Sequence, residues 1–177
     1  MKQLKKAVLV VVIYIVYLGV GSLLDSEATS TTMTSAVVEW VSDGDTLRLT
    51  DGSKVRIIGM NAPEINSHEA FSEEAKDFAI ETLKDQNVYL EADKETEDQY
   101  DRKLYYVWLA PQKEGEVPNM ADNFTYLMLE RGLARVYTFA PNDKYYDAFI
   151  SAQDEAIRAK RGMWAVSHEG TTRGNDL

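Results

Sequence analysis

Oxygen-bearing side chains occur in two short motifs of the chain. The segment DGDT at 43–46 places two carboxylates in one turn, and NAPE at 61–64 adds an amide and a third carboxylate. Amide and carboxylate oxygens are ligands of hard cations, and such a set fits calcium better than a metal that seeks nitrogen or sulfur. Asp45 and Asn61 are therefore candidate Ca²⁺ ligands, and Glu64 is a candidate proton acceptor for a water molecule.

Two arginines accompany these oxygen ligands. Arg56 lies in the apolar run that leads to Asn61, and Arg102 follows Tyr100 and Asp101 before another apolar run. A guanidinium group binds phosphate oxygens through two parallel hydrogen bonds and stays charged at any working pH. A cation, two arginines and a base are together the parts that phosphodiester hydrolysis requires.

Each motif taken alone also has a simpler explanation. Asp43-Gly44 is a common hairpin turn, and a strand arginine such as Arg56 often lies solvated on a sheet face. Pro63-Glu64 after a strand can merely end it. The functional interpretation therefore depends on the fold bringing the motifs together.

The pattern of apolar residues predicts the elements that must do so. Three strands in a meander are expected first, then a helix that starts at Ser72, two further strands, a helix stopped by Gly132, an extended segment and a last helix. The expected segments are 36–42, 46–50, 54–60, 88–92 and 104–109 for strands, and 72–83, 124–131 and 145–159 for helices. This order predicts an α+β, mainly β, fold: a five-stranded oligonucleotide-binding (OB) barrel with three packed helices.

The chain divides into four parts by composition. Residues 1–24 combine three lysines with an uncharged apolar run at 7–24, which is typical of a signal peptide or signal anchor. A flexible linker at 25–35, one domain at 36–165 and a loose polar tail at 166–177 follow. The domain is expected outside the cell, either secreted or held at the membrane through 7–24 if the leader is not cleaved.

The chain is acidic overall, although its first 24 residues are basic. The net charge is −10, and without the three leader lysines 16 basic residues face 29 acidic ones. Proteins that bind nucleic acid mainly by neutralising phosphates are usually basic, so the charge disfavours tight binding of this kind. The chain has no cysteine, which excludes disulfides, thiol catalysis and thiolate metal sites.

The ordered motifs resemble those of the staphylococcal nuclease (thermonuclease) family. The resemblance covers about residues 37–164, nearly all of the expected domain, and several spaced motifs in one order are specific. The matching segments are DGDT at 43–46, RIIGMNAPE at 56–64, YDR at 100–102, RGLARV at 131–136 and GMW at 162–164.

The resemblance implies a calcium-dependent nuclease that hydrolyses DNA and RNA with little sequence preference. Water would attack phosphorus in line and leave 3′-phosphates, and we expect a monomer that favours single strands. Carried over position by position, the implied roles are calcium ligation by Asp45, Asn61 and the carbonyl of Ala62, catalysis by Arg56, Glu64 and Arg102, and substrate binding by Tyr100 and Tyr137.

Four positions depart from the family pattern. Asn61 stands in place of aspartate, which removes a negative charge from the metal site and predicts weaker calcium affinity. Asp101 replaces glycine; it could pair with Arg102, repel phosphate or point away. Gln99 and Phe139 stand where a lysine and a tyrosine often occur, so a weaker hold on substrate is expected.

Two other functions are compatible with the same fold. A degenerate barrel could bind nucleic acid without cutting it, and the changes at Asn61 and Asp101 favour that alternative. Retention of Arg56, Glu64 and Arg102 favours hydrolysis, because binding alone does not need that trio. A membrane-tethered protein-interaction domain would leave the ordered motifs unexplained.

Overall fold

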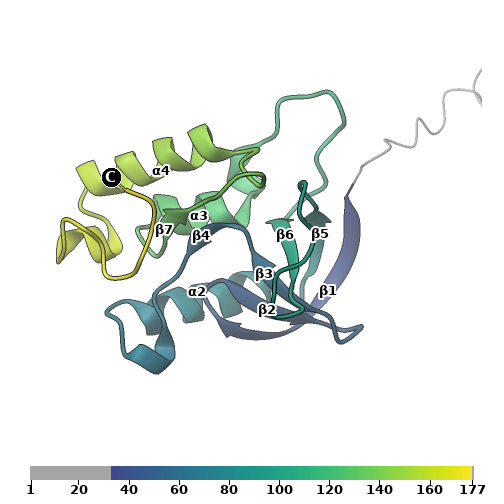
Figure 1. Ribbon diagram of the computed structural model, residues 1–177, viewed down its shortest axis with the longest axis horizontal. Helices are drawn as coiled ribbons and strands as arrows, with labels where there is room; N and C mark the ends of the chain where they lie inside the picture. The colour runs from purple at the N-terminus through teal and green to yellow at the C-terminus, as the bar shows by residue number, and fades with distance from the viewer. Residues whose placement is uncertain (1–32, 177) are drawn as a thin grey trace, which may run out of the picture. The chain divides into compact units, whose positions relative to one another are not determined.

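The computed structural model describes residues 33–176 (Figure 1). The predicted leader, and the linker as far as residue 32, lie outside the described residues. The strands are β1 (Thr34–Asp43), β2 (Thr46–Leu49), β3 (Lys54–Ile57), β4 (Gly59–Asn61), β5 (Asn87–Glu91), β6 (Lys103–Trp108) and β7 (Arg135–Tyr137). The helices are α2 (Ser72–Leu83), α3 (Phe124–Glu130) and α4 (Tyr146–Arg158), with 3-10 turns η1 (Ile65–Ser67), η2 (Met120–Asp122) and η3 (Gly162–Ala165).

Five strands form a closed barrel in the order β1-β2-β3-β6-β5, which confirms the predicted OB-type barrel. The strand β1 serves two neighbours: Thr34 to Val37 pair with β5, and Val38 to Asp43 pair with β2. Register shifts between Val38 and Asp43 bend β1 so that it can do both. Only the β3–β6 pairing in this barrel is parallel.

The strand expected at 54–60 is two strands separated at Ile58. Gly59 has φ 90°, and a Cβ at this position would lie 2.4 Å from the Phe149 ring of α4. The chain therefore turns out of the barrel here, and β4 pairs with β7 instead. This pairing directs Asn61 and the loop after it away from the barrel wall and toward α2.

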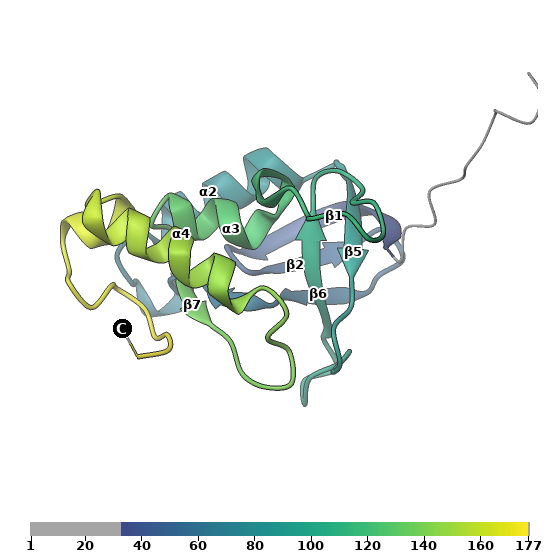
Figure 2. The ribbon, with the colours of Figure 1, turned by 90° about the horizontal axis from the view of Figure 1, so that it is seen from above.

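The three predicted helices are all present and cover one side of the barrel (Figure 2). Their buried faces, including Leu83, Met128 and Phe149, join the barrel interior in one apolar core. Ser72 is the first residue of α2 and not its cap, because Phe71 holds the capping position with φ 70°. No helix within residues 33–176 has both the length and the apolar character needed to cross a bilayer.

The C-terminal segment is packed and not loose, contrary to the expectation from its polar composition. Asn175 donates its backbone N–H to Val136 O at 2.8 Å, and its side chain bonds both the N–H and the carbonyl of Thr138. Arg135 donates to the carbonyls of Thr172 and Asn175. The segment therefore returns along β7, as Figure 2 shows.

Candidate active site

The turn between β1 and β2 presses against the loop that follows β4. Asp43 pairs with Thr46, so Gly44 and Asp45 form a two-residue hairpin loop. A Cβ on Gly44 would lie 2.6 Å from the Ala62 Cβ. Glycine is needed here because any larger residue would push the two loops apart.

This close approach buries the Asp45 carboxylate between two loops. Its Oδ2 accepts the backbone N–H of Ala62 at 2.9 Å and lies 3.0 Å from Arg56 Nη2. Its Oδ1 accepts the Thr46 hydroxyl at 3.0 Å. Asp45 is 5% exposed, so these partners replace the water that an isolated carboxylate would need.

Arg56 reaches from β3 across the bend at Gly59. Its guanidinium donates to the carbonyls of Ile57 and Met60 and to Asn61 Oδ1, the last at 3.1 Å. Together with the ion pair to Asp45, these bonds fix the path of the chain into β4. Arg56 therefore organises the site as well as contributing a charge to it.

Asn61 is buried, at 1% exposure, and its amide is bonded on both sides. While Oδ1 accepts from Arg56, Nδ2 donates to the Ala62 carbonyl at 3.2 Å and to the Thr172 hydroxyl at 2.9 Å. The two oxygens expected to ligate a cation beside Asp45 thus have internal hydrogen-bond partners. A cation bound through them would share each oxygen with its present donor, since a carbonyl oxygen has two lone pairs.

The donor set nevertheless fits a hard cation. Burial, and then the nearby charges of Asp45 and Glu64, raise the pKa of Asp43 to about 6, so the three carboxylates lie close enough to influence one another. Within residues 33–176, no three histidine or carboxylate side chains converge to hold an ion. A cation at Asp45 would therefore be completed by neutral oxygens such as those of Asn61 and Ala62.

Arg102 lies in a tight turn ahead of β6. Its Nε and Nη2 are 2.8 and 2.7 Å from Asp98 Oδ2, and its guanidinium lies 5.6 Å from the Tyr100 ring centroid. Asp98 also accepts the backbone N–H groups of Tyr100 and Arg102. Although burial raises the pKa of Asp98, these hydrogen bonds outweigh it and the pKa is lowered.

Asp101 does not compete for Arg102 within the described residues. It has φ 61°, a left-handed conformation that glycine adopts without cost, and its side chain is exposed. The carboxylate partner of Arg102 is Asp98 instead. Of the three possibilities left open by the sequence, pairing with Arg102 is therefore the one that the described residues do not support.

One cavity of about 600 Å³ brings the substrate-binding candidates together. Arg56 enters it from β3, Tyr100 and Arg102 from the turn before β6, and Tyr137 from β7. The carboxylates on its wall are Glu95, Glu97 and Asp98.

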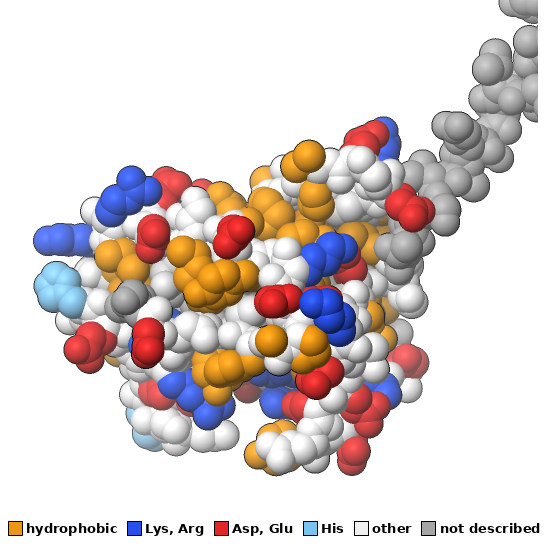
Figure 3. Space-filling model, turned by 45° about the horizontal axis from the view of Figure 1, so that its top comes forward, with side chains coloured by type: hydrophobic (Ala, Val, Ile, Leu, Met, Phe, Trp, Pro, Cys, Tyr) orange, Lys and Arg blue, Asp and Glu red, His pale blue; other side chains and the backbone are white. Residues whose placement is uncertain are grey.

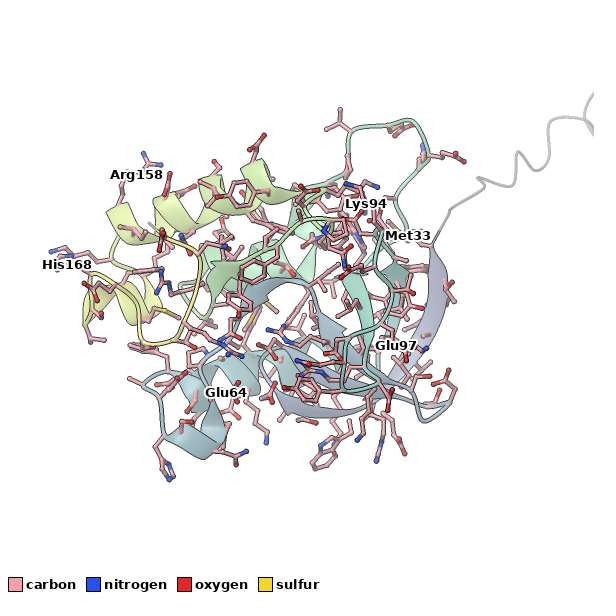
Figure 4. The ribbon with its side chains drawn as sticks, viewed as in Figure 1. Met33, Glu64, Lys94, Glu97, Arg158 and His168 are labelled. Atoms are coloured by element: carbon pink, nitrogen blue, oxygen red, sulfur yellow. The ribbon has the colours of Figure 1, made fainter. Side chains whose placement is uncertain are left out.

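Glu64 stands apart from this cavity on the loop between β4 and α2 (Figure 4). Its backbone N–H donates to Glu69 Oε2 at 2.8 Å, which closes the loop on itself. Among the described residues, its carboxylate has neither a hydrogen bond nor an ion pair, and it is half-buried. The charge of this carboxylate acts on Asp43.

Three residues that contribute to the site were not predicted from the sequence: Asp98, Thr172 and Arg173. Asp98 could have been found, because an aspartate two residues before Tyr100 is typical of a side chain that bonds the backbone of its own turn. Thr172 and Arg173 carry no such signal. They reach the site only because the C-terminal segment folds back over β7.

Two arginines of the barrel, Arg56 and Arg102, line one cavity, and Arg56 is also paired with the buried Asp45. Guanidinium groups are the side chains best suited to bind phosphate oxygens. The profile of the family described as Staphylococcal nuclease homologue matches residues 54–166. The chain belongs to this family.

Similar proteins cover most of the chain. It is 32% identical to a thermonuclease from Staphylococcus intermedius over 176 residues, spanning 93% of this chain and 99% of that protein. A thermonuclease from Staphylococcus hyicus is 30% identical over 179 residues, again spanning 93% of this chain and 99% of that protein. Endonuclease YncB from Bacillus subtilis (strain 168) is 31% identical across 75% of this chain and 62% of its own length.

Proposed function

We propose that the protein is a calcium-dependent nuclease that hydrolyses phosphodiester bonds of DNA and RNA. The observation that carries the proposal is the convergence of Arg56 and Arg102 on one cavity, with Arg56 also paired to the buried Asp45. The names of the similar proteins, thermonuclease and endonuclease, support the same activity.

The calcium ion would be held by Asp45, with oxygens of Asn61 and Ala62 completing the set. Once bound, it would supply positive charge to a non-bridging phosphate oxygen. The acidic turn at Asp43 and Asp45 favours a cation electrostatically.

The residues of the chain perform the remaining steps. The Glu64 carboxylate takes a proton from water as the water oxygen bonds to phosphorus, the bond from phosphorus to the 5′-oxygen breaks, and the leaving 5′-oxygen takes a proton from solvent. Arg56 and Arg102 stabilise the charge that grows on the phosphoryl oxygens. The products are a 3′-phosphate and a 5′-hydroxyl.

Aromatic side chains favour a single-stranded substrate. Tyr100 and Phe139 are 68% and 58% exposed, and Tyr137 meets Phe139 edge to face with centroids 4.7 Å apart. Exposed rings beside guanidinium groups suit unpaired bases, which stack on them without regard to sequence.

Cleavage of a single-stranded DNA oligonucleotide by the purified full chain tests the proposal. We expect cutting in calcium and none in excess chelator, with 3′-phosphate ends. Glu64→Gln should lower kcat by roughly 10² to 10⁴ and Arg102→Ala by roughly 10² to 10³. A folded protein that binds the oligonucleotide but cuts under no condition would replace this proposal with a binding barrel.

Export is a further part of the proposal, motivated by the lysine-led apolar run at 7–24. Detection of the domain in culture medium would identify a secreted form, and detection in the membrane fraction an anchored one. Retention in the cytoplasm would contradict export.

A further inference from the structure

We infer that Arg173, supplied by the C-terminal segment, is a third phosphate-binding arginine of the substrate cavity. The segment lies beyond residues 54–166, the part of the chain that the family profile matches. This inference rests on the proposed nuclease function for its substrate, a single-stranded polynucleotide.

Arg173 lies over Tyr137, which forms part of the cavity wall. It lines the same cavity as Arg56 and Arg102, and its guanidinium lies 5.3 Å from the ring centroid of Tyr137. An arginine over an aromatic face is held in position while its hydrogen-bond donors stay directed outward. The side chain is exposed and therefore accessible to a ligand.

The residues on either side of Arg173 fix its backbone. Thr172 is buried and accepts a hydrogen bond from Asn61 Nδ2 at 2.9 Å. A Cβ on Gly174 would lie within 3 Å of both Arg135 and Val136, so the chain fits tightly against β7. Arg173 thus projects from an anchored segment and loses little conformational freedom on binding.

Arg173 differs from the other two arginines of the cavity in how far its charge is compensated. Arg56 is paired with Asp45 and Arg102 with Asp98, so part of each charge is already compensated. Within residues 33–176, Arg173 has no carboxylate within 4.0 Å. Three carboxylates share the cavity wall with only these three arginines, so without Arg173 the wall would be net negative.

The same segment also touches the predicted cation site. The Thr172 hydroxyl meets the Asn61 amide, and the next residue is Arg173. Substrate contact at Arg173 is therefore linked through a single buried residue to the side chain expected to ligate calcium.

Steady-state cleavage and equilibrium binding of a single-stranded DNA oligonucleotide test the inference. Arg173→Ala should raise KM about five- to tenfold and leave kcat within about twofold, and Arg173→Lys should recover part of the loss. Binding is measured in calcium by fluorescence anisotropy in a Glu64→Gln background. There the slope of log affinity against log salt should fall by about 0.7 on Arg173→Ala.

The matched control is Arg158→Ala, which removes the same charge from the exposed face of α4, remote from the cavity (Figure 4). Equal KM, affinity and salt slope for the two alanine variants would overturn the inference while the nuclease function stands. Binding that weakens only with Arg173→Ala in a protein that never cuts would support the inference and reject the function. No binding by the unsubstituted protein would reject both.

Discussion

Asn61 is a neutral side chain held between a guanidinium and a carbonyl oxygen. Its amide satisfies both neighbours at once, since Oδ1 faces Arg56 and Nδ2 faces Ala62 O and Thr172 Oγ1. A carboxylate at this position would place a negative oxygen against the Ala62 carbonyl. The amide thus stabilises the site without a metal, and we expect it to lower the affinity for one.

Replacing Asn61 with aspartate should reverse this balance. We expect Asn61→Asp to bind calcium roughly tenfold more tightly, because affinity rises with ligand charge, and to lose about 1–2 kcal/mol of stability in chelator. Calcium titration by calorimetry and thermal unfolding in chelator measure the two effects. Asn87→Asp, at an exposed strand position, is the control for added charge; equal calcium affinity in the two variants would contradict the assignment of Asn61.

Asp101 carries both a backbone cost and a charge next to Arg102. Because its φ is 61°, Asp101→Gly should raise stability by up to about 1 kcal/mol, and removing the carboxylate should raise kcat/KM a few-fold at low salt. Asp101→Asn separates the effects, since asparagine tolerates this conformation but lacks the charge. Kinetics that respond to glycine but not to asparagine would exclude the electrostatic explanation.

At the scale of elements, the site depends on how closely the β1–β2 turn approaches the loop after β4. Gly44→Ala should cost about 1–3 kcal/mol, since the new methyl would lie 2.6 Å from Ala62 Cβ and must separate the loops. That separation would break the bond from Ala62 N to Asp45 and lower kcat/KM.

Gly52→Ala is the matched control for this substitution. Gly52 also lies in a hairpin turn, but a Cβ there meets nothing within 4 Å. Its positive φ of 88° predicts some loss of stability without loss of activity. If both variants lost activity equally, close approach of the loops would not be what Gly44 provides. Denaturant unfolding and kcat/KM measurements compare them.

The elements themselves were largely readable in the sequence, whereas their connections were not. Alternating apolar residues predict the barrel strands, and Gly132 ends α3 as expected. The break at Gly59 was missed because it is caused by Phe149, which is 90 positions away in the chain. Periodicity reports which face of an element is buried, not which distant side chain will press on it.

The same limit applies to the site. The pairing of Arg56 with Asp45 follows from adjacent strands, since Arg56 lies opposite Thr46. The sequence motifs predicted that the two residues share one site, but not that they pair. The contact of Asn61 with Thr172 joins residues 111 positions apart through a polar segment that has no hydrophobic period. Its order comes from hydrogen bonds to β7, which composition does not reveal.

For the whole molecule, the positive charges at the cavity must attract the substrate although the chain as a whole is acidic. The chain carries a net charge of −10, and acidic and basic side chains are interspersed over the face in Figure 3. A polyanionic substrate is therefore expected to be attracted only at the cavity, where a bound cation would add its charge to those of the three arginines. We therefore expect weak substrate binding that added salt weakens further. Such binding suits an enzyme that must release its product.

Calcium should also stabilise the whole fold, because its expected ligands come from two segments that are separate in the sequence, the β1–β2 turn and the end of β4. At a concentration 100 times its Kd, a ligand that binds only the folded state adds about 2.7 kcal/mol, which raises Tm by roughly 5–10 °C in a protein of this size. Thermal unfolding in calcium and in chelator measures the shift, and Asp45→Ala should abolish it. A Tm that calcium leaves unchanged, or a shift that survives Asp45→Ala, would place the metal elsewhere than between the β1–β2 turn and the loop after β4.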